Sequence, residues 1–201
     1  MKLYYALPLC LLLACGSEQG SERSGNESND TALARENTKP SSSRESTERI
    51  AAEPVTVTVD ASSYENPIFL KFEEGLIVAE QDSAWDLSVK RTQFQTNSGT
   101  SGDGAIGVFH SGKKDFEAVN ECVFDALAYD EELPVPGPPG SGTFSGNPIL
   151  NDWYDYDFAT HSVTSKGDVY LVTDENVCFK LQILGYSRGV FEIRTASLPL
   201  P

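Results

Sequence analysis

Two histidines are the residues of this chain whose chemistry is easiest to assess. His110 and His161 are the only histidines in 201 residues, and a neutral imidazole can act as a general base or bind a metal. Neither lies in a hydrolase motif such as HExxH, and the chain contains no GxSxG sequence. We therefore expect a protein that is not an enzyme, in which these imidazoles serve binding or packing.

The first two of the four cysteines belong to an apolar N-terminus. Lys2 precedes an apolar run from Leu3 to Leu13, and Leu12-Leu13-Ala14-Cys15 follows the pattern of a bacterial lipoprotein signal. The run is too short to span a membrane. We predict that residues 1–15 are a signal peptide ending at the lipidated Cys15, held in the membrane by several acyl chains. The alternative is ordinary secretion. Gly16 in place of Asp favours sorting to the outer membrane.

The remaining cysteines, Cys122 and Cys178, predict a disulfide. An even pair of cysteines in an exported domain is typical of a bridge. Closing a loop of this length would stabilise the fold by roughly 4 kcal/mol. The alternative is two separate buried thiols.

Composition divides the rest of the chain into a tether and one domain. Residues 16–54 are rich in Ser, Glu, Asn and Thr and lack aromatic side chains, so they cannot bury enough apolar surface to fold. A flexible tether of this length spans roughly 35 Å. Residues 55–201 have the length of one ordinary domain. The net charge of −15 excludes binding to a nucleic-acid backbone, which needs concentrated Lys and Arg.

Short segments with β-type patterning dominate the domain. In several of them apolar and polar residues alternate, which is typical of strands. Val169–Thr173 and Val177–Gly185, joined by Asp174-Glu175-Asn176, predict a hairpin. We predict an all-β fold, a mostly antiparallel sheet or sandwich of about eight to ten short strands. The strand-like segments are residues 55–59, 68–72, 77–79, 85–96, 105–110, 169–173, 177–185 and 189–195.

Two further segments complete the expected architecture. Apolar residues at helical spacing within Asp115–Leu127, with Asp115 as N-cap, predict at most one short helix. Residues 130–151 contain the sequence PVPGPPGSG, and we expect this Pro/Gly-rich segment to be a long loop without regular structure.

Two groups of motifs are similar to those of the HmuY family. Trp85-Asp86-Leu87-Ser88 and the sequence FQTNSGTS, residues 94–101, resemble the WDL…TNGGxS stretch of that family. Trp153-Tyr154-Asp155-Tyr156, Thr160-His161, Val169-Tyr170 and Phe179-Lys180-Leu181 resemble its second motif. The resemblance covers most of residues 55–198, with the Pro/Gly-rich loop as an insertion. It implies an all-β, membrane-anchored lipoprotein that binds haem and partners an outer-membrane haem receptor.

The resemblance also implies a ligand set for haem b. Family members hold the iron between two His or Met side chains, and the only methionine here, Met1, is lost with the signal. His161 and His110 are therefore the expected axial ligands. The alternatives are a packing or hydrogen-bonding role for His161 and a surface position for His110. The expected pocket residues are Tyr154, Tyr156 and Phe158 along the porphyrin, and Lys113, Lys114 and Lys166 beside its propionates.

The function expected from these residues is haem capture and delivery. A surface-exposed outer-membrane lipoprotein would bind haem and pass it to an importer in the same membrane. The alternative is a non-catalytic surface interaction module that shares the fold and binds no haem.

Overall fold

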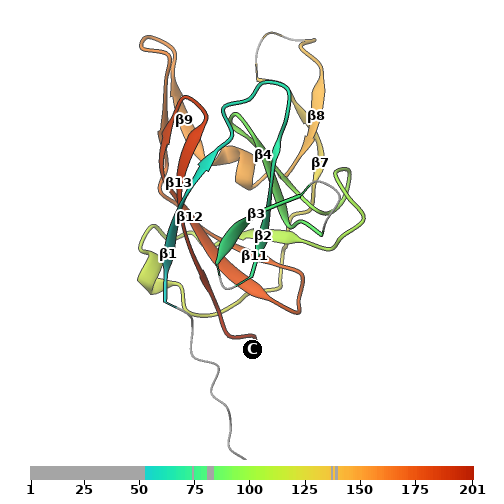
Figure 1. Cartoon of the computed structure of the whole chain (residues 1–201), viewed down its shortest axis with the longest axis vertical. Coiled ribbons are helices and arrows are strands. Elements are labelled where there is room, and N and C mark those ends of the chain that lie inside the picture. The colour runs from blue at the N-terminus through green and yellow to red at the C-terminus, as the bar shows by residue number, and fades with distance from the viewer. Residues whose placement is uncertain (1–52, 74, 81–83, 137, 139) are drawn as a thin grey trace, which may run out of the picture. The chain divides into compact units, whose positions relative to one another are not determined.

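The computed structural model describes residues 53–73, 75–80, 84–136, 138 and 140–201 (Figure 1). The predicted signal peptide, with Cys15, and nearly all of the predicted tether lie outside these residues. Within the described part the fold is nearly all β, with thirteen strands, two short 3₁₀ turns and no longer helix. None of the helical segments described is long and apolar enough to cross a membrane.

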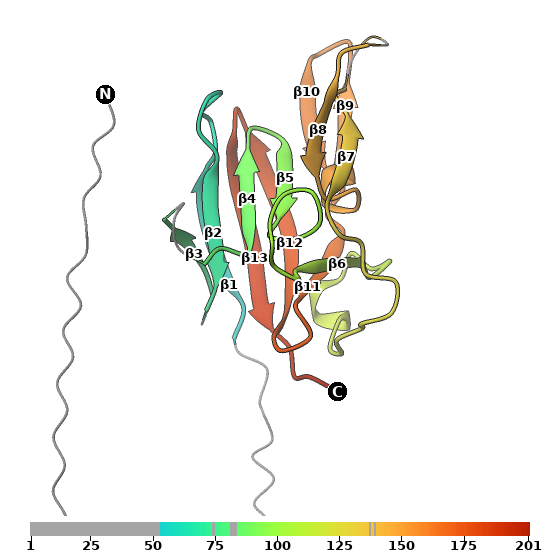
Figure 2. The ribbon, with the colours of Figure 1, turned by 90° about the vertical axis from the view of Figure 1, so that its right-hand side faces the viewer.

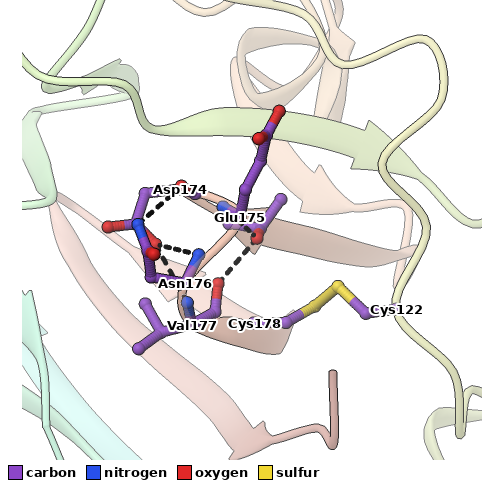
Figure 3. The surroundings of a disulfide bond; sticks show 7 residues. Cys122, Asp174, Glu175, Asn176, Val177 and Cys178 are labelled. Carbon is purple, nitrogen blue, oxygen red and sulfur yellow. Dashed lines mark hydrogen bonds between the residues drawn. A yellow bond between two sulfur atoms is a disulfide. The ribbon is translucent and has the colours of Figure 1, made fainter. Parts of the chain in front are cut away.

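The larger sheet has five strands in the order β1-β13-β12-β11-β6, and every pairing in it is antiparallel. The predicted 174–176 hairpin is confirmed as the turn between β11 and β12. Asp174 closes this turn, because its Oδ1 accepts the backbone N–H groups of Asn176 and Val177, each at 2.9 Å (Figure 3). The strands are β1 (Val55–Asp60), β6 (Gly107–His110), β11 (Val169–Thr173), β12 (Cys178–Ser187) and β13 (Val190–Ser197).

The second sheet has four strands in the order β3-β2-β4-β5 and lies alongside the first (Figure 2). Both sheets contribute to one core, in which Phe72 stacks on Phe179 with ring centroids 4.5 Å apart. Phe94 and Phe191 meet edge to face at 5.2 Å. The predicted antiparallel sandwich is therefore confirmed. The strands are β2 (Ile68–Phe72), β3 (Leu76–Ala79), β4 (Leu87–Lys90) and β5 (Gln93–Thr96).

Two separate hairpins explain why the strand number exceeds the predicted range. β9 (Tyr154–Asp157) pairs with β10 (Ser162–Ser165). β7 (Glu131–Pro134) pairs with β8 (Thr143–Gly146) inside the segment for which we expected no regular structure, so that expectation is wrong. The two strands can pair because Pro134 is the last residue of β7, where a missing N–H donor is tolerated. The other prolines up to residue 139 lie between the two strands.

In Asp115–Leu127, where we expected at most one short helix, the fold has a single short helical turn. Only the 3₁₀ turn η1 (Phe116–Ala118) forms, and Asp115 caps it as predicted by accepting the Glu117 N–H. The buried Lys180 amine donates to the carbonyls of Phe116 at 2.9 Å and Val119 at 3.1 Å. These carbonyls are therefore used by a side chain from β12, where a helix would need them for its own backbone.

The disulfide predicted between Cys122 and Cys178 is confirmed (Figure 3). The two Cα atoms lie 6.2 Å apart, and both residues belong to a second, smaller apolar cluster. The bridge ties the irregular segment after η1 to the first residue of β12, beside the β11–β12 turn.

Candidate functional site

Several hairpin turns converge on one pocket. Its lining comes from the β1–β2 loop, the β4–β5 turn, the β9–β10 hairpin and the β12–β13 turn, and its volume is about 540 Å³. That volume is in the range of small-molecule sites, about 300–1,000 Å³. We call it the hairpin pocket; it is lined by Tyr64, Arg91, Thr92, Tyr156, His161, Ser162, Val163, Tyr186, Ser187 and Arg188.

The β9–β10 hairpin is held in place by Trp153, which directly precedes β9. Its indole is only 1% exposed and packs against Tyr186 and Phe191 of the larger sheet. The indole N–H donates to the carbonyl of Thr92, at 3.0 Å, in the β4–β5 turn. Trp153 therefore fixes the hairpin against both sheets.

His161 lies in the turn that joins β9 to β10, with a positive φ of 55°. Its Nδ1 forms a 2.8 Å hydrogen bond with the Tyr156 hydroxyl, and no hydrogen bond to Nε2 is present within the described part of the chain. When Nδ1 carries the proton and donates to Tyr156, Nε2 presents a lone pair, the arrangement of metal-binding histidines with an orienting partner.

The same turn is ordered by Asp157. Its carboxylate accepts the Thr160 hydroxyl at 2.8 Å and the Ala159 N–H at 2.7 Å. The hydrogen bond from the Thr160 hydroxyl lowers the pKa of Asp157 below its usual range. The bonds from the backbone N–H groups of Ala159 and Thr160 lower this pKa further. His161 therefore lies on a turn that is stabilised by hydrogen bonds to the Asp157 carboxylate.

Arg91 connects three of the turns that surround the pocket. Its Nη1 donates to the carbonyls of Ser62 and Arg188, each at 3.0 Å, and its guanidinium lies 4.4 Å above the ring of Tyr64. These contacts tie the β1–β2 loop and the β12–β13 turn to the β4–β5 turn.

The lining of the hairpin pocket differs in charge from the rest of the chain. The chain has 30 acidic and 15 basic residues, yet the lining contains two arginines and no carboxylate. The pocket therefore offers an apolar and aromatic surface with local positive charge, which suits an anionic aromatic ligand.

His110 lies elsewhere, and both of its ring nitrogens have partners. Its Nδ1 accepts the Gly112 N–H at 3.0 Å, which leaves the proton on Nε2, 3.4 Å from the Asp168 carboxylate. The ring also meets Tyr170 edge to face at 5.4 Å. His110 therefore has a structural position at the junction of β6 and β11.

The structure does not bring His110 and His161 together. His110 is aligned with Tyr170 in β11, and Tyr170 with Leu181 in β12, whereas the hairpin pocket contains Tyr186, five residues further along β12. Two strand spacings and five residues of rise place His110 roughly 19 Å from Tyr186. His110 is not among the residues that line the hairpin pocket, so the pocket contains one of the two histidines expected as axial ligands.

The lysines expected beside the propionates lie on the His110 side and have protein partners. Lys113 Nζ donates to the Ala118 carbonyl at 2.7 Å, and Lys114 Nζ to the Lys166 carbonyl at 2.7 Å. Lys166 pairs with Asp152 at 2.6 Å. None of the three lines the hairpin pocket.

Of the three expected aromatic pocket residues, only Tyr156 lines the pocket. Tyr154 packs on Trp153 and lines a smaller, separate cavity of about 230 Å³ with Pro134 and Phe144. Phe158 is 82% exposed at the hairpin tip and touches Tyr156 edge on.

Eight of the ten lining residues were not expected from the sequence, and four of these eight have aromatic or charged side chains. Two are arginines in tight turns, Arg91 and Arg188, and two are tyrosines, Tyr64 and Tyr186. The Arg188-Gly189 pair between two strand-like segments was a recognisable turn signal. Tyr64 lies in an irregular loop, where periodicity offers no signal.

The fold and the pocket define a class of protein: a β-sandwich whose turns surround a pocket of small-molecule size. The family is established by sequence, because the model of the HmuY protein family matches residues 63–194. The chain therefore belongs to the HmuY family. A search of curated proteins finds no match.

Solved structures with the same fold have low sequence identity to this chain. The apo HmuY analogue of Tannerella forsythia is 15% identical with a TM-score of 0.57, over 74% of this chain and 98% of that one. Apo PinO from Porphyromonas gingivitis is 12% identical with a TM-score of 0.53, over 73% and 98%. A candidate lipoprotein from Bacteroides fragilis is 17% identical with a TM-score of 0.53, over 72% and 90%. At these identities the likeness concerns the fold.

Proposed function

We propose that this protein is a membrane-anchored lipoprotein that captures haem in the hairpin pocket and passes it to an outer-membrane importer. The observation that carries the proposal is His161, which lines the pocket with Nδ1 bonded to Tyr156 and with no partner for Nε2 among the described residues. Membership of the HmuY family supports haem as the cargo.

The residues of the pocket fit haem in size and in chemistry. The cavity of about 540 Å³ is wide enough for most of a porphyrin, and the rings of Tyr64, Tyr156 and Tyr186 line it. His161 Nε2 is a suitable iron ligand, because haem iron is commonly held by a neutral imidazole. The hydroxyl of Tyr156 would orient the imidazole and raise its basicity.

The proposal retains one of the two histidines expected from the sequence. His161 binds the iron, while His110 remains with Asp168 and Gly112 and takes no part. A tyrosine of the same pocket could help to hold the iron, since tyrosine is also a known haem ligand.

The anchoring part of the proposal rests on the sequence at Cys15. In Figure 1 the start of β1 lies at the opposite end of the domain from the β9–β10 turn. A tether spanning roughly 35 Å between Cys15 and the domain would let the domain reach an importer in the same membrane. Mass spectrometry of the membrane fraction tests the anchor: a diacylated or triacylated Cys15 is expected, and an unmodified N-terminus beyond Cys15 would exclude it.

Haemin titration of the purified protein tests the function. A sharp Soret band should appear at one equivalent, and His161→Ala should shift or abolish it. His110→Ala is the matched control and should leave the band unchanged. A band lost in His110→Ala and kept in His161→Ala would refute the site, and no band in the wild type would favour an interaction module without haem.

A further inference from the structure

The two tight turns beside the pocket carry arginine where turn geometry favours other residues. β12 and β13 are joined by Arg188–Gly189, both with positive φ, 53° and 97°. That pattern belongs to type I′ turns, which prefer Asn-Gly. β4 and β5 are joined by Arg91–Thr92, and Arg91, with φ 57°, occupies the position that glycine favours in type II′ turns.

Backbone strain of this kind is concentrated at the hairpin pocket. Five non-glycine residues of the described chain have positive φ, and three of them, Arg91, His161 and Arg188, line this one pocket. A left-handed backbone is unfavourable for residues with long side chains and persists where the side chain is needed. The two arginines therefore occupy positions at which asparagine or glycine would fold more easily.

The ion pairs of the other basic side chains also indicate that the pocket arginines serve a ligand. Elsewhere in the domain Lys71, Lys166 and Arg194 each pair with a carboxylate. The exposed guanidinium of Arg188 has neither an ion pair nor a hydrogen bond within the described residues. Arg91 uses one nitrogen on two backbone carbonyls and stacks on Tyr64, and no carboxylate lines the pocket to neutralise either charge.

We propose that Arg188 and Arg91 form a carboxylate-recognition subsite at the hairpin pocket. Arg188 supplies charge-assisted hydrogen bonds to a ligand carboxylate, and Arg91, fixed by its backbone contacts, supplies a constant positive field. The inference rests on the proposed function, because it assigns the subsite to the propionates of the bound porphyrin. It also specifies the ligand class: a porphyrin with free carboxylates, in preference to its neutral ester.

The experiment compares haemin with its dimethyl ester, which keeps the iron and the ring and removes both negative charges. Both are titrated into the full protein in the same detergent solution and followed by the Soret band. The wild type should bind haemin about tenfold or more tightly than the ester, the effect of one charge-assisted hydrogen bond. Arg188→Asn should weaken haemin binding by about the same factor, leave ester binding unchanged, and so abolish the preference.

The variants are chosen so that a folding defect cannot be mistaken for a lost subsite. Asn suits the first position of a type I′ turn, so Arg188→Asn should unfold at a temperature no lower than the wild type. Lys90→Asn removes one positive charge beside Arg91 from a residue that lines a different cavity, and it should preserve the preference for haemin. Arg188→Lys should restore part of it, because the charge returns without the planar fork.

Two outcomes separate this inference from the function on which it rests. A normal Soret band with equal affinity for haemin and ester would overturn the subsite alone. No band with either ligand would overturn the proposed function and the subsite with it. A preference that survives in Arg188→Asn and disappears in Lys90→Asn would also refute the assignment.

Discussion

Removing the disulfide should destabilise the domain strongly without affecting the hairpin pocket. The perturbation is the double substitution Cys122→Ala and Cys178→Ala. The two half-cystines are 9% and 2% exposed and are separated by 56 residues in the sequence. In the chain-entropy model, opening a loop of that length stabilises the unfolded state by about 4 kcal/mol at 25 °C.

Urea unfolding measures this loss directly. The midpoint should fall in the double variant, and the melting temperature should drop by roughly 8–16 °C, since a domain of this size loses about 2–4 °C per kcal/mol. Wild-type protein unfolded in the presence of a reductant is the matched control and should behave like the variant. Ligand titrations should give the wild-type result, because neither cysteine lines the hairpin pocket. A loss below about 1 kcal/mol would show that the bridge does not restrain the unfolded chain as the entropy model requires.

Three smaller predictions concern polar groups that hold the turns and edges. Asn151→Ala should cost about 2 kcal/mol in urea unfolding, because the Asn151 amide bonds both the N–H and the C=O of Phe94, at 2.9 and 2.7 Å, and the substitution leaves that N–H unpaired. Lys180→Met should cost about 1–3 kcal/mol and speed amide exchange around η1, since two carbonyls there lose their donor. Because the folded-state pKa of Asp157 is lowered, its stabilisation is present above pH 3.8 and is lost as pH falls through the folded value. Amide exchange at Ala159 should accelerate over that range, and not in Asp157→Asn.

The strands that the sequence predicted well are those whose patterning is local. β1 and β2 were expected at residues 55–59 and 68–72 and form at Val55–Asp60 and Ile68–Phe72. The β11–β12 hairpin was predicted from two β-rich segments around Asp174. In these elements side-chain alternation, burial and turn chemistry agree, so a short window of sequence is sufficient.

The elements that the sequence did not predict depend on partners far along the chain. The expected helix after Asp115 loses its carbonyls to Lys180, 64 and 61 residues away. The β7–β8 hairpin lies beside β5, where Gln95 donates to the Ser145 carbonyl from 50 residues away. A local sequence pattern contains no information about such contacts. In these two segments the contacts determine the structure more strongly than local secondary-structure propensity does.

The two histidines expected as ligands lie in different parts of the fold for a related reason. Sequence analysis could find His110 and His161 because they are rare, but their separation depends on the strand order of the larger sheet. β6 joins the edge of that sheet beside β11, which places His110 next to Asp168, while His161 is carried on a hairpin outside it. The rarity of histidine identified the candidate ligands, but the strand order of the sheet determines which of them lie close together.

A site built on turns can change its ligand preference while the sandwich stays the same. The core of this domain is formed largely by strand residues such as Phe94 and Phe191, whereas the arginines and the histidine of the pocket lie on turns. Substituting a turn residue removes little buried apolar area, so recognition groups can vary at small cost to the fold. Structures that share this fold at 12–17% identity therefore say little about the ligand here. In the function proposed above the cargo is recognised by His161 and Arg188, and substitutions at these two turns are the ones that test that proposal.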